Sequence, residues 1–511
     1  MPCRSSGRGT PGAWHDNTGA ERIGGQFMVD TLIVGGGTAG SVLAARLSAD
    51  SRRTIRVLEA GPLWTTPDGI PAELLDIAAL PIGPQAQWLW RYAVSLADDP
   101  PVHAGIVRGK VIGGSATVNG GYFVRATRMD FAAWSRLLGG SEIWSFDSVL
   151  PMYCRIERDL DFGDAPWHGA RGPIPVRRTV DPSPVGAAFT AACRAAGYAD
   201  VPDLNEPEAG DGVGAVPCAS EDGRRMGPAL GYLLPALDRP NLTVVGETYV
   251  TRIRFDGLRA IGVDCLREGR THTEWADRVV LSAGAIESAA LLLRSGIGDP
   301  GHLRALGIPV VQAAGVGVGF SDHPEIGIDY RADLPARPAI ALERVLEVGA
   351  VEIRPYTMSF TPGCHTLGAA LMRPRSTGSL RLRSADPVVA PLIDYRYLVE
   401  DQDRTRLSDA VSIAGELLGR MGAEPVDPIP ERGDRGRWLH THLATSQHLS
   451  GTCRMGHDND PAAVVDERCR VRGVTGLSIV DLSVVPIPLS RGPQATAMMI
   501  AEMAADRFLA R

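Results

Sequence analysis

Several features that would assign this chain to a special class of protein are missing from its sequence. Its eight cysteines form no C-x-x-C pair, which argues against a disulfide framework or a zinc ribbon and favours a reducing cytoplasm. No run approaches the roughly eighteen apolar residues of a membrane span, and residues 1–27 lack the apolar core of a signal peptide. We therefore expect a cytoplasmic protein without a transmembrane segment, and peripheral contact with the inner face of the membrane stays open.

Blocks of a single charge are missing too. The chain has 52 basic and 59 acidic side chains, and its net charge is −7. Without a basic cluster, nucleic-acid binding has no electrostatic basis and is excluded as a function. With 511 residues, of which 44% are hydrophobic, the chain can bury a large core in about two or three structural units. Residues 1–27 are rich in turn formers, so we expect disorder there and a natural start at Met28.

The first recognisable unit is a strand, a glycine turn and a helix. An apolar run at 30–34 predicts a strand, the segment 35–40 reads Gly-Gly-Gly-Thr-Ala-Gly, and residues 41–49 predict an amphipathic helix. A second parallel strand is predicted at 54–58, directly before Glu59. This order is typical of a dinucleotide-binding unit.

Each position in this unit suits a dinucleotide. Gly35 permits the tight turn, Gly37 lets the backbone approach a pyrophosphate, and Gly40 lets the helix pack closely on the strand. The N-terminus of the helix offers unpaired N–H groups to the anion. Glu59 would accept a hydrogen bond from a ribose 2′-hydroxyl and would repel a 2′-phosphate.

Two segments follow this unit. Residues 62–104 carry many prolines and aromatics without a clear period, which predicts an irregular lid; a packed surface excursion is the alternative. Residues 107–122 combine glycines with small hydroxyl side chains, which predicts a flat floor for a cofactor; a glycine-rich turn without a ligand is the alternative. A spacing of about seventy residues would let the two glycine segments hold opposite ends of one long cofactor.

The rest of the chain predicts two kinds of sheet. Alternating patterns predict strands at 241–255 and 260–266. A buried strand at 278–284, which leads into a helix at 285–294, is expected to return the chain to the parallel sheet. Strands without intervening helices, which predict an antiparallel sheet, are expected at 326–331, 351–360, 367–372 and 379–383. A helix is expected at 401–421.

We therefore predict an α/β fold with a Rossmann-type cofactor domain and a second, substrate domain built on an antiparallel sheet. The expected divisions are a disordered extension at 1–27, the cofactor domain at 28–320, the substrate domain at 321–444, and a return to the cofactor domain at 445–511. Several isolated aromatic and histidine side chains are assigned no chemistry, either as core or interface residues (Trp134, Trp144, Trp167, His168) or as surface or loop residues (His440, His442, His457). No set of residues has metal-ligand spacing, so no metal is expected.

The chemistry is predicted near the C-terminus. Residues 446–456 read Ser-Gln-His-Leu-Ser-Gly-Thr-Cys-Arg-Met-Gly, and a helix at 495–509 follows Pro493. An imidazole can take a hydroxyl proton near neutral pH, so His448 is the candidate base. A lone histidine with a purely structural role is the alternative.

The chain resembles the glucose–methanol–choline (GMC) flavoprotein oxidoreductases over roughly residues 28–511. Four blocks carry this resemblance: the first glycine turn with Glu59-Ala60-Gly61, residues 109–122, residues 281–298, and His448 to Met455 together with Val480 to Pro486. Residues 106–109, 119–123, 352–357 and 490–493 resemble more narrowly the mycofactocin-associated branch found in actinobacteria.

The resemblance implies FAD as the cofactor. The residues implied at its ADP half are Gly35, Gly37, Gly40 and Glu59, with Val250, Ala283 and Gly284 nearby; those implied near the isoalloxazine are Gly113, Gly114, Asn119 and Gly120, and Asp481 is implied near the pyrophosphate. Further cofactor contacts are predicted from Thr38, Ala39, Ala60, Thr117, Gly121, Gln494 and Thr496. Some relatives attach the flavin through a histidine directly before the position of Asn119. Here that residue is Val118, so non-covalent FAD is expected.

The resemblance also implies the catalytic pair. His448 matches the catalytic histidine of the family, which takes the hydroxyl proton while the carbinol carbon gives hydride to flavin N5. Gln494 stands where relatives carry His or Asn; it can donate to a substrate oxygen but cannot act as a second base. The N-terminus of the helix at 495–509 would stabilise the anionic reduced flavin.

The leading hypothesis is therefore an FAD-dependent alcohol dehydrogenase rather than an oxidase. The branch resemblance implies a reduced mycofactocin-type redox cofactor as the donor, in place of a simple small-molecule alcohol, and an electron acceptor in the respiratory chain. Two alternatives stay open: a non-redox lyase like the hydroxynitrile lyases of this family, and a flavin-holding redox partner without alcohol activity of its own.

Overall fold

A computed structural model describes residues 22–23, 26–335, 337 and 339–509. Most of the predicted disordered extension, residues 1–27, lies outside the described residues. Within it, β1 (Arg22–Ile23) and β2 (Gln26–Phe27) pair antiparallel. Among the helices of the described residues, none combines the length and the apolar character needed to cross a bilayer.

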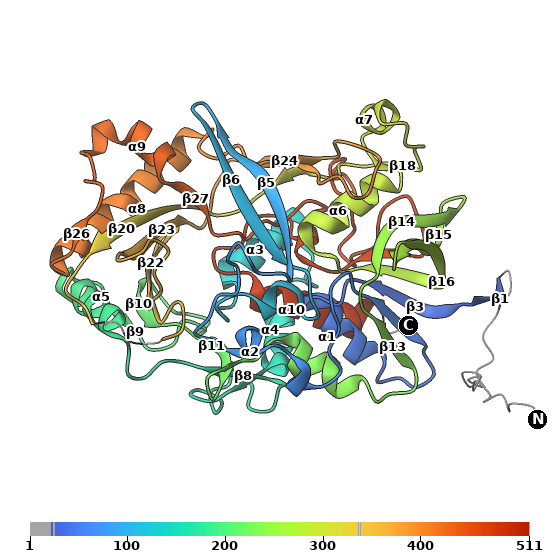
Figure 1. The fold of residues 1–511 in the computed structure, drawn as a ribbon, viewed down its shortest axis with the longest axis horizontal. Coiled ribbons are helices and arrows are strands. Elements are labelled where there is room, and N and C mark those ends of the chain that lie inside the picture. The colour runs from blue at the N-terminus through green and yellow to red at the C-terminus, as the bar shows by residue number, and fades with distance from the viewer. Residues whose placement is uncertain (1–21, 24–25, 336, 338, 510–511) are drawn as a thin grey trace, which may run out of the picture.

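A seven-stranded sheet forms one half of the molecule (Figure 1). Its strands, in spatial order, are β13 (Leu242–Val245), β4 (Ile55–Leu58), β3 (Val29–Val34), β16 (Arg270–Leu281), β15 (Arg259–Arg267) and β14 (Tyr249–Asp256), with β28 (Leu477–Ile479) also beside β16. The strands β13, β4, β3, β16 and β28 run parallel, as the sequence predicts. Thr31 and the three apolar residues 32–34 that follow it are almost fully buried, because helices cover the sheet.

Three helices connect this sheet to the candidate site. They are α1 (Thr38–Leu47), α6 (Gly284–Arg294) and α10 (Gln494–Met503). Each of the first two begins after a short turn at the end of a parallel strand, Gly35 to Gly37 before α1 and Ser282-Ala283 before α6, so both N-termini lie at the same edge of the sheet. α10 packs against α1 and brings the C-terminal part of the chain to that edge.

An eight-stranded sheet forms the other half. Its strands are β26 (Glu424–Pro425), β20 (Pro324–Arg331), β23 (His365–Leu371), β22 (Val351–Tyr356), β21 (Arg344–Val348), β10 (Gly212–Ala215) and β9 (Asp200–Val201), with β27 (Leu443–Thr445) beside β20. All its pairs are antiparallel except β9 with β10, which confirms the predicted second sheet. Residues 200–215, inside the range predicted for the cofactor domain, thus supply two strands to this sheet. The helix α8 (Asp401–Arg420) packs on β22 and β23.

A third sheet corrects two predictions. It contains β19 (Val318–Phe320), β24 (Gly378–Arg381), β25 (Leu392–Asp394), β5 (Leu89–Asp98) and β6 (Pro101–Gly109). The strand expected at 379–383 therefore belongs here rather than to the substrate sheet. Residues 89–104 are not an irregular lid, because β5 and β6 form a long hairpin that stands between the two large sheets (Figure 1).

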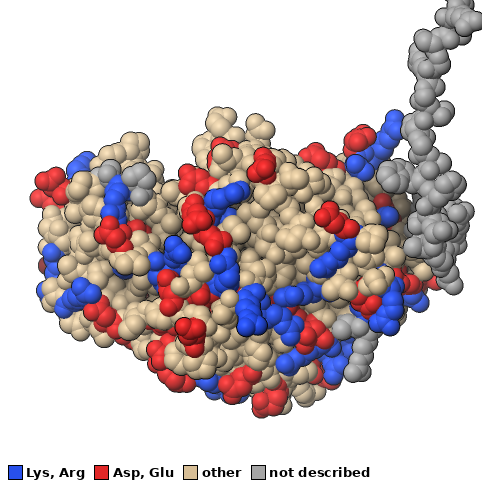
Figure 2. Space-filling view, turned by 90° about the horizontal axis from the view of Figure 1, so that it is seen from below, with Lys and Arg blue, Asp and Glu red and all other residues tan. Residues whose placement is uncertain are grey.

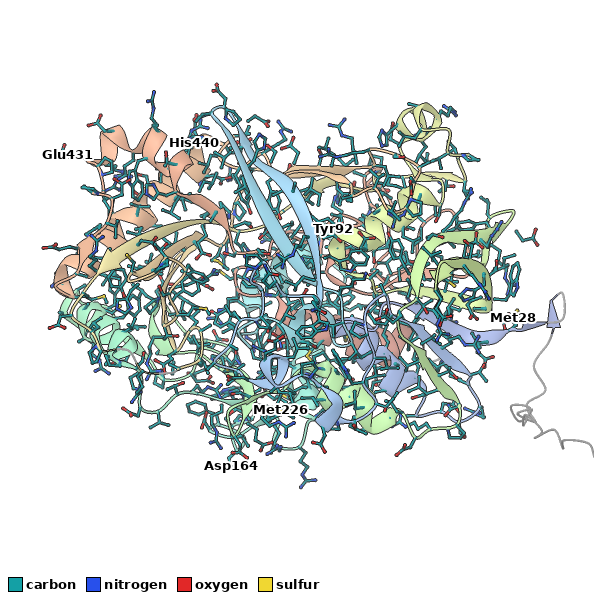
Figure 3. All side chains as sticks on the ribbon, in the orientation of Figure 1. Met28, Tyr92, Asp164, Met226, Glu431 and His440 are labelled. Atoms are coloured by element: carbon teal, nitrogen blue, oxygen red, sulfur yellow. The ribbon has the colours of Figure 1, made fainter. Side chains whose placement is uncertain are left out.

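The composition around this hairpin masks its strand pattern in the sequence. Tyr92, Val94 and Leu96 on β5 alternate toward the interior and are at most 4% exposed, a period-two pattern that prolines and tryptophans on either side obscure. Figure 3 labels Tyr92, which lies near the centre of the molecule. On the face drawn in Figure 2, acidic and basic side chains are interspersed.

Smaller elements complete the fold. A four-stranded sheet joins β12 (Arg224–Arg225), β11 (Cys218–Glu221), β8 (Ile174–Arg177) and β7 (Glu157–Asp159), and β17 (Ile297–Gly298) pairs with β18 (Gln312–Ala313). The remaining α-helices are α2 (Ala72–Leu75), α3 (Arg128–Leu137), α4 (Phe146–Ile156), α5 (Pro184–Ala195), α7 (Pro300–Ala305) and α9 (Arg435–Thr441). Trp134 and Trp144 stack edge to face in the core with no exposed surface, as predicted.

Candidate active site

A cavity of about 830 Å³ lies where the sheets meet, and residues from both halves of the molecule line it. Fifteen of the predicted site residues line this cavity: Gly35, Gly37, Thr38, Ala39, Glu59, Ala60, Gly114, Asn119, Gly120, Val250, Ala283, Gly284, His448, Asp481 and Gln494. The structure thus brings together positions more than 400 residues apart in the chain. Five predicted residues do not line it: Gly40, Gly113, Thr117, Gly121 and Thr496.

The first glycine turn is shaped by close backbone contacts. Gly35 has φ +97°, and a Cβ there would lie 2.6 Å from the Ser282 carbonyl oxygen. A Cβ on Gly40 would lie 1.9 Å from the Gly35 carbonyl oxygen, so Gly40 serves helix packing rather than ligand contact. A Cβ on Gly37 would meet no protein atom closer than 3.6 Å, so this glycine leaves open space in the cavity.

Glu59 is held by the backbone at the end of β4. Its Oε2 accepts from the Gly36 N–H and its Oε1 from the Gly61 N–H, both at 2.8 Å. Burial raises the pKa of Glu59 to about 7, although both N–H groups act in the opposite direction. The carboxylate lies beside the first glycine turn, where it can accept a hydrogen bond from a bound ligand.

The second glycine segment touches the first one. The Gly113 N–H donates to the Gly36 carbonyl at 2.8 Å, and a Cβ on Gly114 would lie 2.9 Å from the Gly37 Cα. The expectation that the two segments hold opposite ends of a cofactor is therefore wrong for Gly113 and Gly114, because the chain loops back onto α1. The later part of the segment carries Asn119, which contacts Gln494 and lines the same cavity as His448.

His448 is paired with a second histidine that sequence reasoning missed. Its Nδ1 lies 2.8 Å from Nδ1 of His323, and its backbone N–H donates to Asp322 Oδ1 at 2.7 Å. His323 Nε2 lies 2.8 Å from the carbonyl oxygen of Leu489. Since a carbonyl only accepts, His323 carries its proton on Nε2.

This arrangement assigns the tautomer of His448. Burial, reinforced by Arg354, lowers the pKa of His323 to about 3, so its Nδ1 is unprotonated and accepts a hydrogen bond. His448 must then carry its own proton on Nδ1, which leaves Nε2 with a free lone pair. Burial, with His323, Arg354 and Arg108, also lowers the pKa of His448 well below its usual value. The ring lines the cavity as a neutral base ready to accept a proton.

Gln494 is oriented by Asn119. Asn119 Nδ2 donates to Gln494 Oε1 at 2.7 Å, while Asn119 Oδ1 accepts from the Gly121 N–H at 2.9 Å. Because the backbone N–H fixes the orientation of the Asn119 amide, the Gln494 oxygen is occupied and its NH₂ group is left to donate. Gln494 is the first residue of α10, so it also stands at the positive end of that helix.

The predicted residues outside the cavity have structural partners. Thr117 Oγ1 donates to the Ile112 carbonyl at 2.9 Å, and the Thr496 hydroxyl lies 2.7 Å from the Tyr153 hydroxyl, with Thr496 fully buried. Gly121 has φ +71° and turns the chain behind Asn119. Asp481, by contrast, lines the cavity at the N-terminus of α6, where its Oδ2 accepts from the Gly284 N–H at 2.9 Å and from the Ser288 hydroxyl at 2.6 Å.

The second sheet adds a buried ionic network to the cavity. Arg354 bridges Glu325 and Glu352, with nitrogen–oxygen distances of 2.8 and 2.7 Å. Glu325 also accepts from the hydroxyls of Tyr356 at 2.8 Å and Ser446 at 2.7 Å. In the sequence Glu352, Arg354 and Tyr356 served only as marks of resemblance, and Glu325 was assigned no role. The charges at alternate positions of the strand predicted at 351–360, Glu352 and Arg354, were the signal that could have found this network.

Two histidines to which the sequence assigns no chemistry have defined partners. His442, expected at the surface or in a loop, lies in a turn after α9, where it lines the cavity, stacks on Trp438 and forms an ion pair with Asp427. His168 is buried, as predicted for a core or interface residue; its Nδ1 lies 2.6 Å from Glu157 and 3.1 Å from Asp159, and its Nε2 lies 2.8 Å from Asp203.

The His168 cluster has the spacing of a metal site but already has its own cations. Glu157, Asp159 and His168 could each offer one ligand atom. However, Arg125 pairs with Glu157, and Arg178 pairs with Asp159 and Asp203. With His168 protonated the cluster carries three positive and three negative charges, so it is a charge-balanced structural network.

Comparison with known proteins identifies the family. A family model described as GMC oxidoreductase matches residues 29–325, and a second model of the same description matches residues 374–501. The chain belongs to the GMC oxidoreductase family. Members of this family bind FAD. An uncharacterised GMC-type oxidoreductase of Rhodococcus erythropolis is 43% identical over 493 residues, which covers 94% of this chain and 98% of that protein.

Two further relatives extend this picture. The oxygen-dependent choline dehydrogenase of Staphylococcus saprophyticus is 32% identical and covers 93% of this chain and 94% of its own length. The crystal structure of pyridoxine 4-oxidase from Mesorbium loti superposes with a TM-score of 0.88 at 28% identity, over 94% of this chain and 99% of that one. These matches confirm the predicted GMC fold, with its α/β cofactor domain and its antiparallel second sheet.

Proposed function

We propose that this protein oxidises the CH–OH group of an alcohol-type donor with FAD as its cofactor. The observation that supports this best is the His448–His323 pair, which leaves the lone pair of His448 Nε2 in a cavity that also holds the glycine turn and Glu59. His448 takes the hydroxyl proton of the donor. Gln494 donates its NH₂ group to the same oxygen and holds the carbinol in place.

The residues of the cavity fit FAD. Gly37 leaves room for a pyrophosphate beside the N-terminus of α1, and Glu59 offers an acceptor for a ribose hydroxyl. Asn119 and Gly120 lie toward His448, where the isoalloxazine would be held. Bound FAD would supply the hydride acceptor that the protein side chains lack. The N-terminus of α10 presents its positive end to the same part of the cavity.

We further infer that the cofactor is held without a covalent bond. Val118 stands directly before Asn119, lines the cavity and has no nucleophilic atom.

One buried donor also supports a ligand in the cavity: Arg108 Nη2 has no partner among the described residues, and Arg108 lines the cavity near Gln447.

The finer part of the proposal concerns donor and acceptor. The segments 106–109, 119–123, 352–357 and 490–493 support a reduced mycofactocin-type redox cofactor as the donor and a respiratory acceptor, so that the protein acts as a dehydrogenase. Under this proposal it works in the cytoplasm and delivers electrons at the inner face of the membrane. Choline and pyridoxine, the compounds named for the two further relatives, support the general class of donor only.

The test is anaerobic reduction of the purified, FAD-containing protein. Alcohol-type donors should bleach the visible absorbance, and His448→Ala should keep the colour and lose at least a hundredfold in rate. His440→Ala, a histidine on α9 outside the cavity, is the matched control and should reduce at the wild-type rate. Product formation without bleaching would support a lyase instead. If neither bleaching nor product formation is observed, the protein is better explained as a flavin-holding redox partner.

A further inference from the structure

The cavity extends beyond His448 along one face of the second sheet. On β20, Glu325, Gly327 and Asp329 all line the cavity, because alternate residues of a strand point to the same side. Glu325 lies at the inner end, where Ser446, two residues before His448, donates to it at 2.7 Å. Asp329 lies four residues further along β20, roughly 13 Å from Glu325 at ~3.3 Å per residue.

The middle of this face is built from two opposed glycines. Gly327 on β20 pairs directly with Gly368 on β23. A Cβ on Gly368 would lie 2.2 Å from Glu325 Oε1 and 2.9 Å from the Tyr356 ring, so Gly368 makes room for those two side chains. Gly327 differs, because a Cβ there would meet only Thr366 Cγ2, at 3.8 Å.

Nothing in the protein therefore requires glycine at position 327. Its backbone does not have a positive φ, and no neighbouring atom excludes a side chain. In a strand interior glycine is unfavourable, since it adds chain entropy and packs nothing. What Gly327 does provide is an open path between Glu325 and Asp329, which we term the β20 trough.

The outer end of the β20 trough carries a charge without a counter-ion. Asp329 Oδ1 accepts from the Thr366 hydroxyl at 2.7 Å and Oδ2 from the Thr361 hydroxyl at 2.6 Å. Among the described residues, no Lys, Arg or His forms an ion pair with Asp329, whereas the inner Glu325 is paired with Arg354. The half-buried Asp329 carboxylate keeps lone pairs for a further donor.

We propose that the donor of this enzyme is elongated, and that it lies along the β20 trough with a hydroxyl or ammonium group bound to Asp329. This rests on the proposed function, since the carbinol end must reach His448. Short alcohols would fill only the inner end. A chain must advance roughly 13 Å from Glu325 to reach Asp329, or about ten bonds at ~1.3 Å each.

The test uses three series of primary alcohols that end in methyl, hydroxyl or ammonium, each with a chain of two carbons and one of about twelve carbons. The readout is the rate of anaerobic flavin reduction per donor concentration. With the long chains, the polar ends should exceed methyl by about ten- to a hundredfold, the range expected for a hydrogen bond to a charged group. With two carbons the three ends should differ little, because none reaches Asp329. The comparison of diol with amino alcohol shows which polar group is preferred.

Two variants test separately how the chain length of the donor and the charge of Asp329 affect the rate. Asp329→Asn should remove the advantage of the polar ends and leave the short donors unchanged; Asp256→Asn, an exposed carboxylate outside the cavity, is its control. Gly327→Leu should slow the long donors at least tenfold and spare the short ones; Gly105→Leu, a strand glycine with open space and no cavity contact, is its control.

The proposal fails if the end group has no effect at any length, or if Gly327→Leu slows short and long donors alike. If no alcohol bleaches the flavin, the proposed function fails separately. The trough is then tested by calorimetric binding of a long α,ω-diamine and a long α,ω-diol to the FAD-containing protein. Absence of binding of both, or binding unchanged in Gly327→Leu and Asp329→Asn, overturns it.

Discussion

Replacement of His323 by leucine should slow the reduction of the flavin by an alcohol donor without removing the flavin. In the wild-type protein, the His448 Nδ1–H donates a hydrogen bond to His323 Nδ1 at 2.8 Å, and the Leu489 carbonyl holds His323 in the matching tautomer. Leucine has no acceptor, so the His448 ring would lose its orientation and could place its proton on Nε2, the atom that must be free. Under the proposed function, His323 is thus a positioning residue for the base.

The magnitude follows from the hydrogen bond that is lost. When His448 takes a proton it becomes an imidazolium, and the bond to His323 becomes a bond to a charged group, worth ~1.5–3 kcal/mol. At about 1.4 kcal/mol per factor of ten, His323→Leu should lower the rate by about ten- to 150-fold. His323→Gln, whose oxygen can accept while its nitrogen donates to Leu489, should recover part of this loss.

The assay is stopped-flow reduction under anaerobic conditions across pH. Because the pKa of His448 lies well below its usual value, the wild-type rate should persist as the pH falls below about 6.5, the unperturbed value. In His323→Leu the rate should be lowered across this whole pH range, and His323→Gln should recover part of it. A leucine variant with the wild-type rate and the wild-type pH profile would refute the tautomer assignment.

Three further outcomes are expected. Gln494→Leu should lower the rate of donor oxidation about ten- to a hundredfold at unchanged FAD content, because the NH₂ donor is lost while the volume is kept; a loss of FAD instead would make Gln494 a cofactor residue only. Gly37→Val should abolish FAD retention with little change in apoprotein melting, since its side chain would fill open cavity rather than core; retained colour would contradict the assignment. The buried His168 has a pKa that burial lowers but that Asp159, Asp203 and Glu157 raise to about 10, so its contribution to stability is full below about 6.5 and is lost as the pH rises through about 10. Urea unfolding should therefore show wild type losing stability over that window, and His168→Leu should not show the same slope.

Much of the cofactor half was predictable because its constraints are local. The turn at Gly35, the packing at Gly40 and the carboxylate of Glu59 all follow from a strand, a turn and a helix within about thirty residues. The β5–β6 hairpin was not predicted, since its turn lies at Asp99-Pro100 and its alternation is surrounded by prolines and tryptophans. There, pairing across the hairpin decides the structure more than composition does.

Within the candidate site, the sequence indicated single residues but not the pairs that they form. His448 stands in a block dense with glycine and hydroxyl residues, but its partner His323 is 125 residues away and follows an ordinary Asp322. The orientation of Gln494 depends on Asn119, 375 residues upstream. Such pairs are fixed by tertiary packing, which no local period records.

The C-terminal segment has a consequence for biogenesis. β28 pairs with β16, and Val279 faces Leu477 across that pair, nearly two hundred residues later. Asp481 and Gln494 arrive with the same segment. A nascent chain on the ribosome therefore has its nucleotide turn early but cannot close the pocket until residues 477–494 have been synthesised, so capture of the prosthetic group must follow the synthesis of that segment.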